Sequence, residues 1–338
     1  MIPMSDIDVV AGRDGRALCA GLLAGACLVL PLSTEAAAAT YPDKPIRMIL
    51  PGPPGGGADL LARMLSTKLS TALGVAVVID NRSGAGGLVG TELAAKASPD
   101  GYTVIVGNSG PNAVLPAMLK SIPYDPLTSF AAVSLVASTV NLLVVHPAVT
   151  AGSVAELIAL AKARPGQMTF ASGGSGQPSH LSGELFRLQA GIEIVHVPYK
   201  GSGPAVLDLI GGRVSMMFGN IPSVMPQVAA GKLRALAVTS ARRSRLAAQL
   251  PTMAESGLPG YESIQWYGVL VPAATPVAIV RRLHAEIVSA VNAADLQEQL
   301  VKQGFDAIGS TPAEFAAYMK TEIGKWKKVV AAAGIKSD

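Results

Sequence analysis

Four glycine-rich segments of the sequence could bind an anion through the protein backbone. The first turn of a helix leaves N–H groups without intrahelical partners and carries the positive end of the helix dipole. Glycine has no Cβ, so a ligand can come close to such donors. A single glycine-rich segment is also typical of a tight turn, but four of them before predicted helices favour a site for a carboxylate or phosphate. The segments are "PGPPGGGAD" (51–59), "NRSGAGGLVG" (81–90), "ASGGSGQPSH" (171–180) and "PYKGSGPA" (198–205).

Predicted strands and helices alternate along the chain and position these segments. Runs such as "IRMIL" (46–50) and "YTVIV" (102–106) are apolar without clean alternation, which is typical of parallel strands covered on both faces. The fold class is therefore α/β. Ligands of open α/β sheets bind beyond the carboxyl ends of the strands, where the four segments lie. The predicted strands are 46–50, 75–79, 102–106, 141–145, 168–171, 194–197, 214–218, 234–238 and 267–271.

Two other helix starts carry a different signal. "SVAE" (153–156) and "TPAE" (311–314) match the capping box, in which a hydroxyl and a glutamate satisfy the first free N–H groups. The second also has proline at the first helical position. These patterns predict helices that begin at Ser153 and Thr311.

The chain is long enough for two lobes. It has 338 residues, more than a single domain usually has, and we find no low-complexity linker in it. The lobes must then be joined by crossing strands, near 130–139 and 262–271. We expect lobe 1 to comprise residues 40–138 and 262–338, and lobe 2 to comprise residues 139–261.

Residues 1–39 resemble a secretory signal peptide. Arg13 and Arg16 precede an apolar run, and small residues offer a cleavage site near Ala39. The run contains glycines, ends at Pro31 and is shorter than the roughly 20 residues that a spanning helix needs. Export with cleavage is therefore favoured over a membrane anchor.

Both cysteines, Cys19 and Cys27, lie in this leader. Lipidation of Cys27 stays open as an alternative to simple cleavage. A mature chain without cysteine has no disulfide, no thiolate nucleophile and no cysteine-based metal site. The formal net charge is +4, and the basic residues are not interleaved with aromatic ones. We therefore expect an anionic small solute, and no nucleic acid, as partner.

Known nucleotide and catalytic motifs do not fit the chain. After the glycines of 52–57 a phosphate-binding loop needs Lys and then Ser or Thr, whereas the chain has Ala58 and Asp59. In "GAGGLVG" the third glycine comes one position too late for a dinucleotide fingerprint, and Gln177 stands where a nucleophile elbow has glycine. The histidines are dispersed without metal-ligand spacing. No catalytic residue, metal site or cofactor is predicted.

Several side chains near the four segments are candidate ligand contacts. His180 lies in a predicted first helical turn and faces the loop before it, whereas His196 inside a strand is interpreted as structural. Asp59 could meet a ligand hydroxyl, an amine or a water, or could only stabilise the helix dipole. Lys200 could supply positive charge or be solvated, and Ser109 could donate its hydroxyl or cap its loop.

Five stretches, in order along the chain, carry a family resemblance. They are "YPDKPIRMILPGPPGGGADLLARML", "NRSGAGGLVGTELAAKASPDGYTVIVGN", "VPYKGSGPAVLDLIGGRVSMMF", "AGKLRALAVTSARRS" and "LPTMAESGLPGY". From about Tyr41 to the C-terminus the chain resembles the Bug or TctC family, the extracytoplasmic solute-binding receptors of tripartite tricarboxylate transporters. The resemblance implies a two-lobe periplasmic-binding-protein fold, type II-like, with a hinge of crossing strands. It also implies a small organic carboxylate as ligand, a periplasmic location and delivery to membrane permease subunits.

The resemblance further implies which residues hold the carboxylate, through backbone amides, hydroxyls and ordered waters. By matching motif, the expected contacts are Gly55, Gly56, Asp59, Gly84, Ala85, Gly86, Ser109, Ser172, Ser175, His180, Tyr199, Lys200, Asn220 and Trp266. One departure is Gly219, where many relatives have Asp, so the contact near Asn220 and the choice of ligand are expected to differ.

We therefore expect a ligand trap that breaks no bond, and a monomer, because a hinged trap must move freely. Two alternatives stay open. A secreted enzyme could use the same cleft, provided that a nucleophile and a base lie within hydrogen-bond reach. A sensory subunit would bind the solute in the same way but present it to a different membrane partner. The sequence does not identify the carboxylate.

Overall fold

Two groups of parallel strands lie in one mixed sheet of the computed structural model, which describes residues 41–335. In each group the first strand lies between the other two, and both neighbours run parallel to it. The expectation of parallel α/β units is therefore confirmed for both groups. One group is β1 (Ile46–Leu50), β2 (Val77–Asn81) and β3 (Thr103–Asn108), and the other is β5 (Met168–Ser172), β6 (Ile194–Pro198) and β7 (Met216–Asn220).

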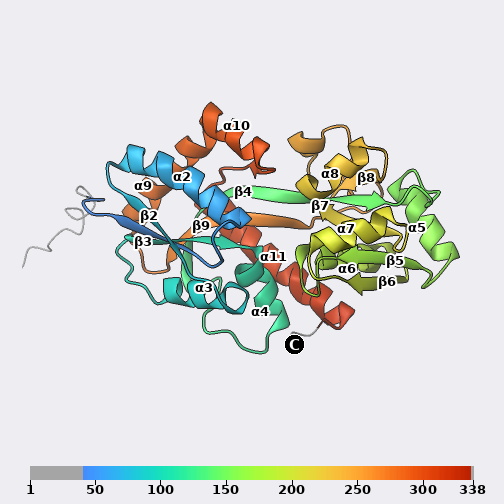
Figure 1. Ribbon diagram of the computed structural model, residues 1–338. Coiled ribbons are helices and arrows are strands. Elements are labelled where there is room, and N and C mark those ends of the chain that lie inside the picture. Colours follow the sequence, from blue (N-terminus) through green and yellow to red (C-terminus); the bar gives the residue numbers. More distant parts are fainter. Residues whose placement is uncertain (1–40, 336–338) are drawn as a thin grey trace, which may run out of the picture. The chain divides into compact units, whose positions relative to one another are not determined.

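Two antiparallel strands connect these groups. β4 (Phe130–Val145) and β9 (Ile264–Pro272) pair with each other, β9 also pairs with β3, and β4 also pairs with β7. The strand order is β2-β1-β3-β9-β4-β7-β5-β6, and Figure 1 shows β4 and β9 running between the two groups. Both stretches that we expected to cross are thus strands. The described residues belong to one compact unit, and the lobe boundaries themselves stay a prediction.

Every predicted strand overlaps an observed one, and the remaining elements surround the sheet. Strands β8 (Arg234–Val238) and β10 (Asp306–Ala307) pair with β4. The helical segments are α2 (Gly57–Leu73), η1 (Ala85–Gly87), α3 (Leu88–Ala95), η2 (Gly110–Val114), α4 (Leu115–Met118), α5 (Val154–Ala163), α6 (Pro178–Ala190), α7 (Ser202–Ile210), α8 (Ile221–Ala229), η3 (Arg245–Ala247), α9 (Val277–Asn292), α10 (Ala294–Lys302) and α11 (Pro312–Ala333).

The two predicted helix caps are confirmed. The Ser153 side chain accepts the N–H of Glu156 at the start of α5. At the start of α11, Thr311 and Glu314 form the complete capping box, with Pro312 at the first helical position. These side chains satisfy donors that the helix itself leaves free.

Burial of apolar side chains holds the strands and helices together. One cluster includes Met48 of β1, Leu65 of α2 and Leu283 of α9, all of them buried. The other includes Phe170 of β5 and Trp326 of α11. Complete burial of one such side chain contributes roughly 1.5–3 kcal/mol. Helix α11 packs against β4, α4 and α6 and so contacts elements that precede and follow the crossing strand.

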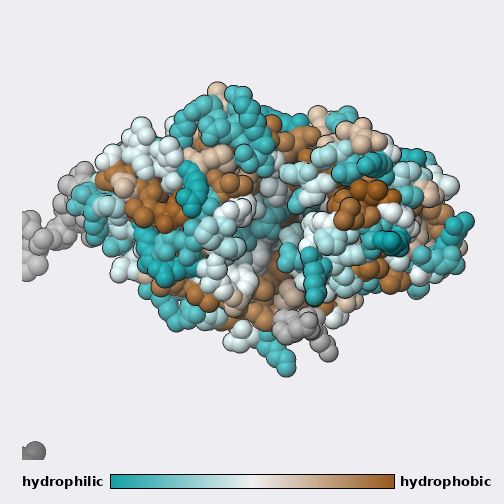
Figure 2. Space-filling model, in the orientation of Figure 1, coloured by the Kyte–Doolittle hydropathy of each residue, from teal (hydrophilic) through white to brown (hydrophobic). Residues whose placement is uncertain are grey.

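Hydrophilic side chains cover much of the face in Figure 2, interrupted by separate hydrophobic patches. Within residues 41–335, none of the helices combines the length and the apolar character required to cross a membrane. The predicted signal peptide at 1–39 lies outside the described residues.

Candidate functional site

A cavity of about 790 Å³ opens at the carboxyl ends of strands from both parallel groups. All four glycine-rich segments contribute to its wall. Gly57 and Gly86 come from the segments after β1 and β2, and Ser175 and Gly201 come from those after β5 and β6. The four segments therefore border one common cavity at the strand ends, where the sequence places them.

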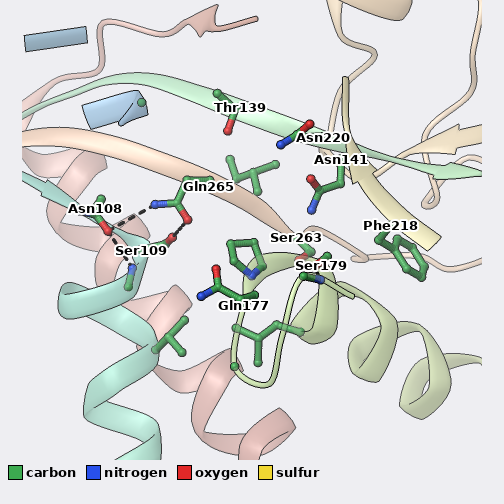
Figure 3. A pocket seen from close by; sticks show the side chains of 18 of the residues that line it. Asn108, Ser109, Thr139, Asn141, Gln177, Ser179, Phe218, Asn220, Ser263 and Gln265 are labelled. Atoms are coloured by element: carbon green, nitrogen blue, oxygen red, sulfur yellow. Dashed lines mark hydrogen bonds between the residues drawn. The ribbon is translucent and has the colours of Figure 1, made fainter. Parts of the chain in front are cut away.

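The wall of this cavity carries no charged side chain from residues 41–335. Hydroxyl and amide side chains alternate with apolar ones, so an anion inside could be held by dipoles and hydrogen bonds instead of a cation (Figure 3). The polar residues include Asn108, Ser109, Thr139, Asn141, Gln177, Ser179, Asn220, Ser263 and Gln265, and the apolar ones include Val114, Leu115, Met118, Leu181, Phe218, Ile264 and Trp326.

Three helices begin at the cavity without a capping side chain from the described part of the chain. Their N-cap residues are Gly56 for α2, Gln177 for α6 and Gly201 for α7. The first N–H groups of each helix have no intrahelical acceptor, and the helix dipole adds partial positive charge there. Negative charge is favoured at such a helix start.

The glycine-rich loops use several of their own N–H groups for internal hydrogen bonds. The Gly55 N–H donates to Asp59 Oδ2 (3.0 Å), and the Gly201 N–H donates to the Gly173 carbonyl (3.0 Å). These bonds fix the shape of the loops. The donors left for a ligand are therefore mainly those of the first helical turns and not those of the loop glycines.

A chain of polar side chains lines the part of the cavity between β3 and β9. Ser109 Oγ donates to Gln265 Oε1 (2.7 Å), and Gln265 Nε2 donates to Asn108 Oδ1 (3.3 Å). Asn108 Oδ1 also accepts the Gly110 N–H (3.1 Å). With its proton directed at Gln265, the Ser109 hydroxyl offers the cavity an acceptor. The side-chain amide protons of Asn108 and Gln265 that this network leaves unpaired are the donors that it offers to the cavity.

Two asparagines that face each other across β4 and β7 line another part of the cavity. Asn220 Oδ1 accepts the Ser223 N–H (3.0 Å) and caps α8, so its NH₂ group is left to donate. Asn141 Nδ2 donates to Ser182 Oγ (3.3 Å). Both amides are thus oriented by neighbouring elements before a ligand arrives (Figure 3).

Comparison with known proteins identifies the family. The model of the tripartite tricarboxylate transporter family receptor, TctC, matches residues 61–335. The chain belongs to the TctC family. It is 40% identical over 315 residues to the protein BugT of Bordetella pertussis. The match covers 93% of this chain and 95% of that relative.

Two solved structures of similar proteins carry ligands. An R. palustris protein with adipate is 38% identical, has a TM-score of 0.70, and the match covers 88% of this chain and 99% of that one. MatC from Rhodopseudomonas palustris with bound malate is 28% identical, with a TM-score of 0.66 and coverage of 86% and 100%. The predicted periplasmic-binding-protein fold is confirmed by these likenesses, and this TctC-family chain is a solute-binding receptor.

The expected contact residues of the TctC motifs divide into two sets. The members that line the cavity are Gly86, Ser109, Ser175 and Asn220. The members that do not line it are Gly55, Gly56, Asp59, Gly84, Ala85, Ser172, His180, Tyr199, Lys200 and Trp266, although Gly56, Ala85, Ser172, His180, Lys200 and Trp266 are each next in sequence to a lining residue. Direct contact with a ligand stays a prediction for every one of them.

Asp59 is a buried support of the first loop. It accepts hydrogen bonds from Arg63 Nε (2.9 Å), from the Gly55 N–H (3.0 Å) and from Asn81 Nδ2 (3.1 Å), and it is 3% exposed. The bond from Arg63 lowers the pKa of Asp59 most; burial opposes this, and the bonds from Gly55 and Asn81 lower the pKa further. A charged Asp59 therefore holds the turn at Gly55 from outside the cavity wall.

Three other expected contacts do not line the cavity. The Tyr199 hydroxyl donates to Asp208 Oδ2 (2.8 Å), and Lys200 is exposed. Trp266 is fully buried and packs edge-on against Phe315. Trp266 thus lies in the core, and the Tyr199 hydroxyl is engaged by Asp208 of α7.

The TctC motifs did not point to Asn108, Gln177 or Gln265, which all line the cavity. The sequence did carry a signal for two of these three residues. Asn108 ends an apolar strand run, and Gln265 interrupts the apolar run of β9. A polar residue in a buried strand needs a hydrogen-bond partner or a ligand.

The departure at Gly219 has a packing reason in this chain. A Cβ at Gly219 would lie 2.3 Å from Cγ1 of Val224 in α8. An aspartate at 219 would therefore need a smaller neighbour than Val224. The Gly219 and Val224 pair leaves the wall near Asn220 without an acidic side chain.

Proposed function

We propose that this receptor captures a small organic carboxylate in the 790 Å³ cavity and delivers it to the permease subunits of a tripartite tricarboxylate transporter. The observation that carries the proposal is the convergence of three uncapped helix starts on a wall to which residues 41–335 contribute no charged side chain. Each helix start favours an anion by about 0.3–1 kcal/mol, and each hydrogen bond to a charged group adds roughly 1.5–3 kcal/mol. No cation is needed for useful affinity.

The relatives support a dicarboxylate in particular. The two solved structures named above hold adipate and malate. Helix starts from both strand groups could each take one carboxylate, and apolar side chains such as Val114 and Leu181 suit the carbon chain between them. We therefore place linear dicarboxylates first among the candidate ligands.

Ligand capture would involve closure of two lobes, residues 40–138 with 262–338 and residues 139–261, about strands β4 and β9. A ligand that contacts both lobes stabilises the closed state, because its contacts are complete only there. The mature protein would work as a periplasmic monomer after cleavage near Ala39.

A thermal-shift and mass-spectrometric screen tests this function. Adipate, malate, citrate, benzoate and glutamate are added to the purified mature protein, and the melting temperature is measured. A bound carboxylate raises it, by an amount set by the ratio of ligand concentration to Kd. We expect a linear dicarboxylate to give the largest rise and to be recovered unchanged. No rise with any organic acid, or turnover of the stabilising one, would contradict the proposal.

One observation favours an enzyme as second candidate. Ser172 Oγ lies 2.6 Å from His196 Nε2, the spacing of a nucleophile and its base. However, Ser172 is 0% exposed and is not part of the cavity wall, so a substrate in the cavity could not reach its hydroxyl. Turnover that disappears in Ser172→Ala would support the enzyme. A sensory role would show the same ligand binding and differ in the membrane protein that binds the closed form.

A further inference from the structure

The loop before α6 forms part of the cavity wall and is held from behind by a histidine. Residues 173–177, here called the α6 loop, include Gly173, Ser175 and Gly176, which line the cavity. The Gly176 N–H donates to His180 Nδ1 (3.0 Å) in the first turn of α6. His180 is 5% exposed and does not itself line the cavity.

This hydrogen bond requires one protonation state of His180. A ring nitrogen that accepts an N–H must carry no proton, so the ring proton of neutral His180 lies on Nε2. Nε2 faces Glu184 Oε1 at 3.7 Å, and Glu184 is held by Arg187 Nε (2.8 Å). Burial alone would raise the pKa of Glu184, but the neighbouring His180 and the hydrogen bond from Arg187 outweigh it and lower the pKa. The charged carboxylate favours a proton on Nε2.

A second histidine stacks on the first and supports the start of the loop. The rings of His180 and His196 are nearly parallel, with centroids 3.8 Å apart. His196 Nε2 lies 2.6 Å from Ser172 Oγ, which accepts the Gly174 N–H (3.1 Å). Burial, and then the neighbouring His180, lower the pKa of His196 to about 4. Positive charge on both stacked rings is unfavourable, because like charges this close repel each other.

We propose that neutral His180 is a positioning residue of the binding site: it holds the Gly176 amide, and with it the α6 loop, where a ligand can bind. Within residues 41–335, the ring of His180 lies next to Glu184 of its own helix and His196 of β6, and Arg187 pairs with Glu184. Protonated Nδ1 would turn an acceptor into a donor opposite Gly176. The choice of probe rests on the proposed function, but the positioning role does not.

Two substitutions of His180 and a matched control test the role. His180→Asn keeps an acceptor oxygen near the position of Nδ1, and His180→Leu removes it. The control is His146→Leu, because His146 Nδ1 accepts the Ala148 N–H (3.2 Å) in a turn that does not line the cavity. We expect the affinity for adipate to fall about tenfold in His180→Leu and about threefold or less in His180→Asn and His146→Leu. Equal losses in both His180 variants, or no loss in His180→Leu, would overturn the proposal.

NMR measurements on the ligand-free protein separate this proposal from the choice of ligand. The Gly176 amide should exchange slowly in the wild type and in His180→Asn, and about tenfold faster in His180→Leu. The ring ¹⁵N signals of wild-type His180 should show a bare Nδ1 and a protonated Nε2. A protonated Nδ1 at neutral pH, or fast Gly176 exchange in the wild type, would overturn the positioning role even if adipate binds. If adipate fails to bind while these signals are as expected, the proposed ligand is wrong and the positioning role stands.

Discussion

The helix starts at the cavity differ from those of α5 and α11. Ser153 and Thr311 cap α5 and α11 with their own side chains, whereas Gly56 and Gly201 leave α2 and α7 uncapped at the cavity. A cap contributes about 0.5–2 kcal/mol to stability. The helix starts at the cavity lack this stabilisation, and their free N–H groups can donate to a ligand instead.

An uncapped start is not by itself a binding feature. Helices α9 and α10 also begin without a side-chain cap from within the described residues, at Pro276 and Ala293. Their first residues are exposed, so water can satisfy the free donors. The distinguishing combination is therefore an uncapped start, glycine at or beside it, and a place in the wall of the cavity.

The largest effect should come from giving α2 a cap of its own. Gly56→Asp places a carboxylate at the start of α2, where it accepts the free N–H groups and repels an anion. Gly56 has φ −76° and ψ 169°, and a Cβ would lie 3.6 Å from the Pro53 carbonyl oxygen, so the side chain fits. We expect a loss of about 100-fold or more in carboxylate affinity, about 2.7 kcal/mol, by isothermal titration calorimetry.

Ala293→Asp is the matched control for that variant. It adds the same charge and the same kind of cap to α10, away from the cavity wall. Affinity should stay unchanged, and the melting temperature of neither variant should fall. Full binding by Gly56→Asp would show that the start of α2 does not hold the ligand.

A smaller loss should follow removal of the support behind the first loop. Asp59→Ala deletes the acceptor of the Gly55 N–H and leaves the turn less ordered. We expect the affinity to fall about tenfold, and the free energy of unfolding to fall by about 1–2 kcal/mol. Titration calorimetry and urea denaturation measure the two effects. Unchanged affinity with lowered stability would assign Asp59 to the helix alone.

At the capped helices, removal of a cap should lower stability and leave ligand affinity unchanged. Thr311→Ala removes both hydrogen bonds of its hydroxyl with Glu314 at the start of α11 and should cost about 1 kcal/mol of unfolding free energy. The Kd for the carboxylate should stay the same. If Thr311→Ala bound the carboxylate more weakly, the capped and uncapped helix starts would not differ in function.

The smallest effect should be the pH dependence of the Asp59 contribution, since its partner Arg63 is 56% exposed and the pairing is screened. The pKa of Asp59 is lowered in the folded state, so its stabilisation is complete above the unfolded value of about 4 and is lost as pH falls through the lower folded pKa. The stability difference between wild type and Asp59→Ala should therefore shrink from pH 6 to pH 2. A difference that is constant over this range would refute the charged role.

Local patterns predicted the loops well, because glycine-rich turns and helix starts depend on neighbouring residues. The cavity residues that these local patterns missed are brought together by long-range strand pairing. Asn108 and Gln265 meet because β3 and β9 pair antiparallel, although 157 positions separate them. Trp266 follows Gln265 directly, and successive side chains of a strand point to opposite faces. The family motifs pointed to Trp266 as a contact, whereas Gln265 lines the cavity and Trp266 packs on the core side against Phe315 of α11.

A crystal structure with the most stabilising carboxylate bound tests the central claim most directly. We predict carboxylate oxygens within about 3.2 Å of backbone nitrogens in the first turns of α2 and of α6 or α7, with no lysine or arginine side chain in contact. A carboxylate that pairs with a basic side chain, or that lies outside the cavity, would contradict the account.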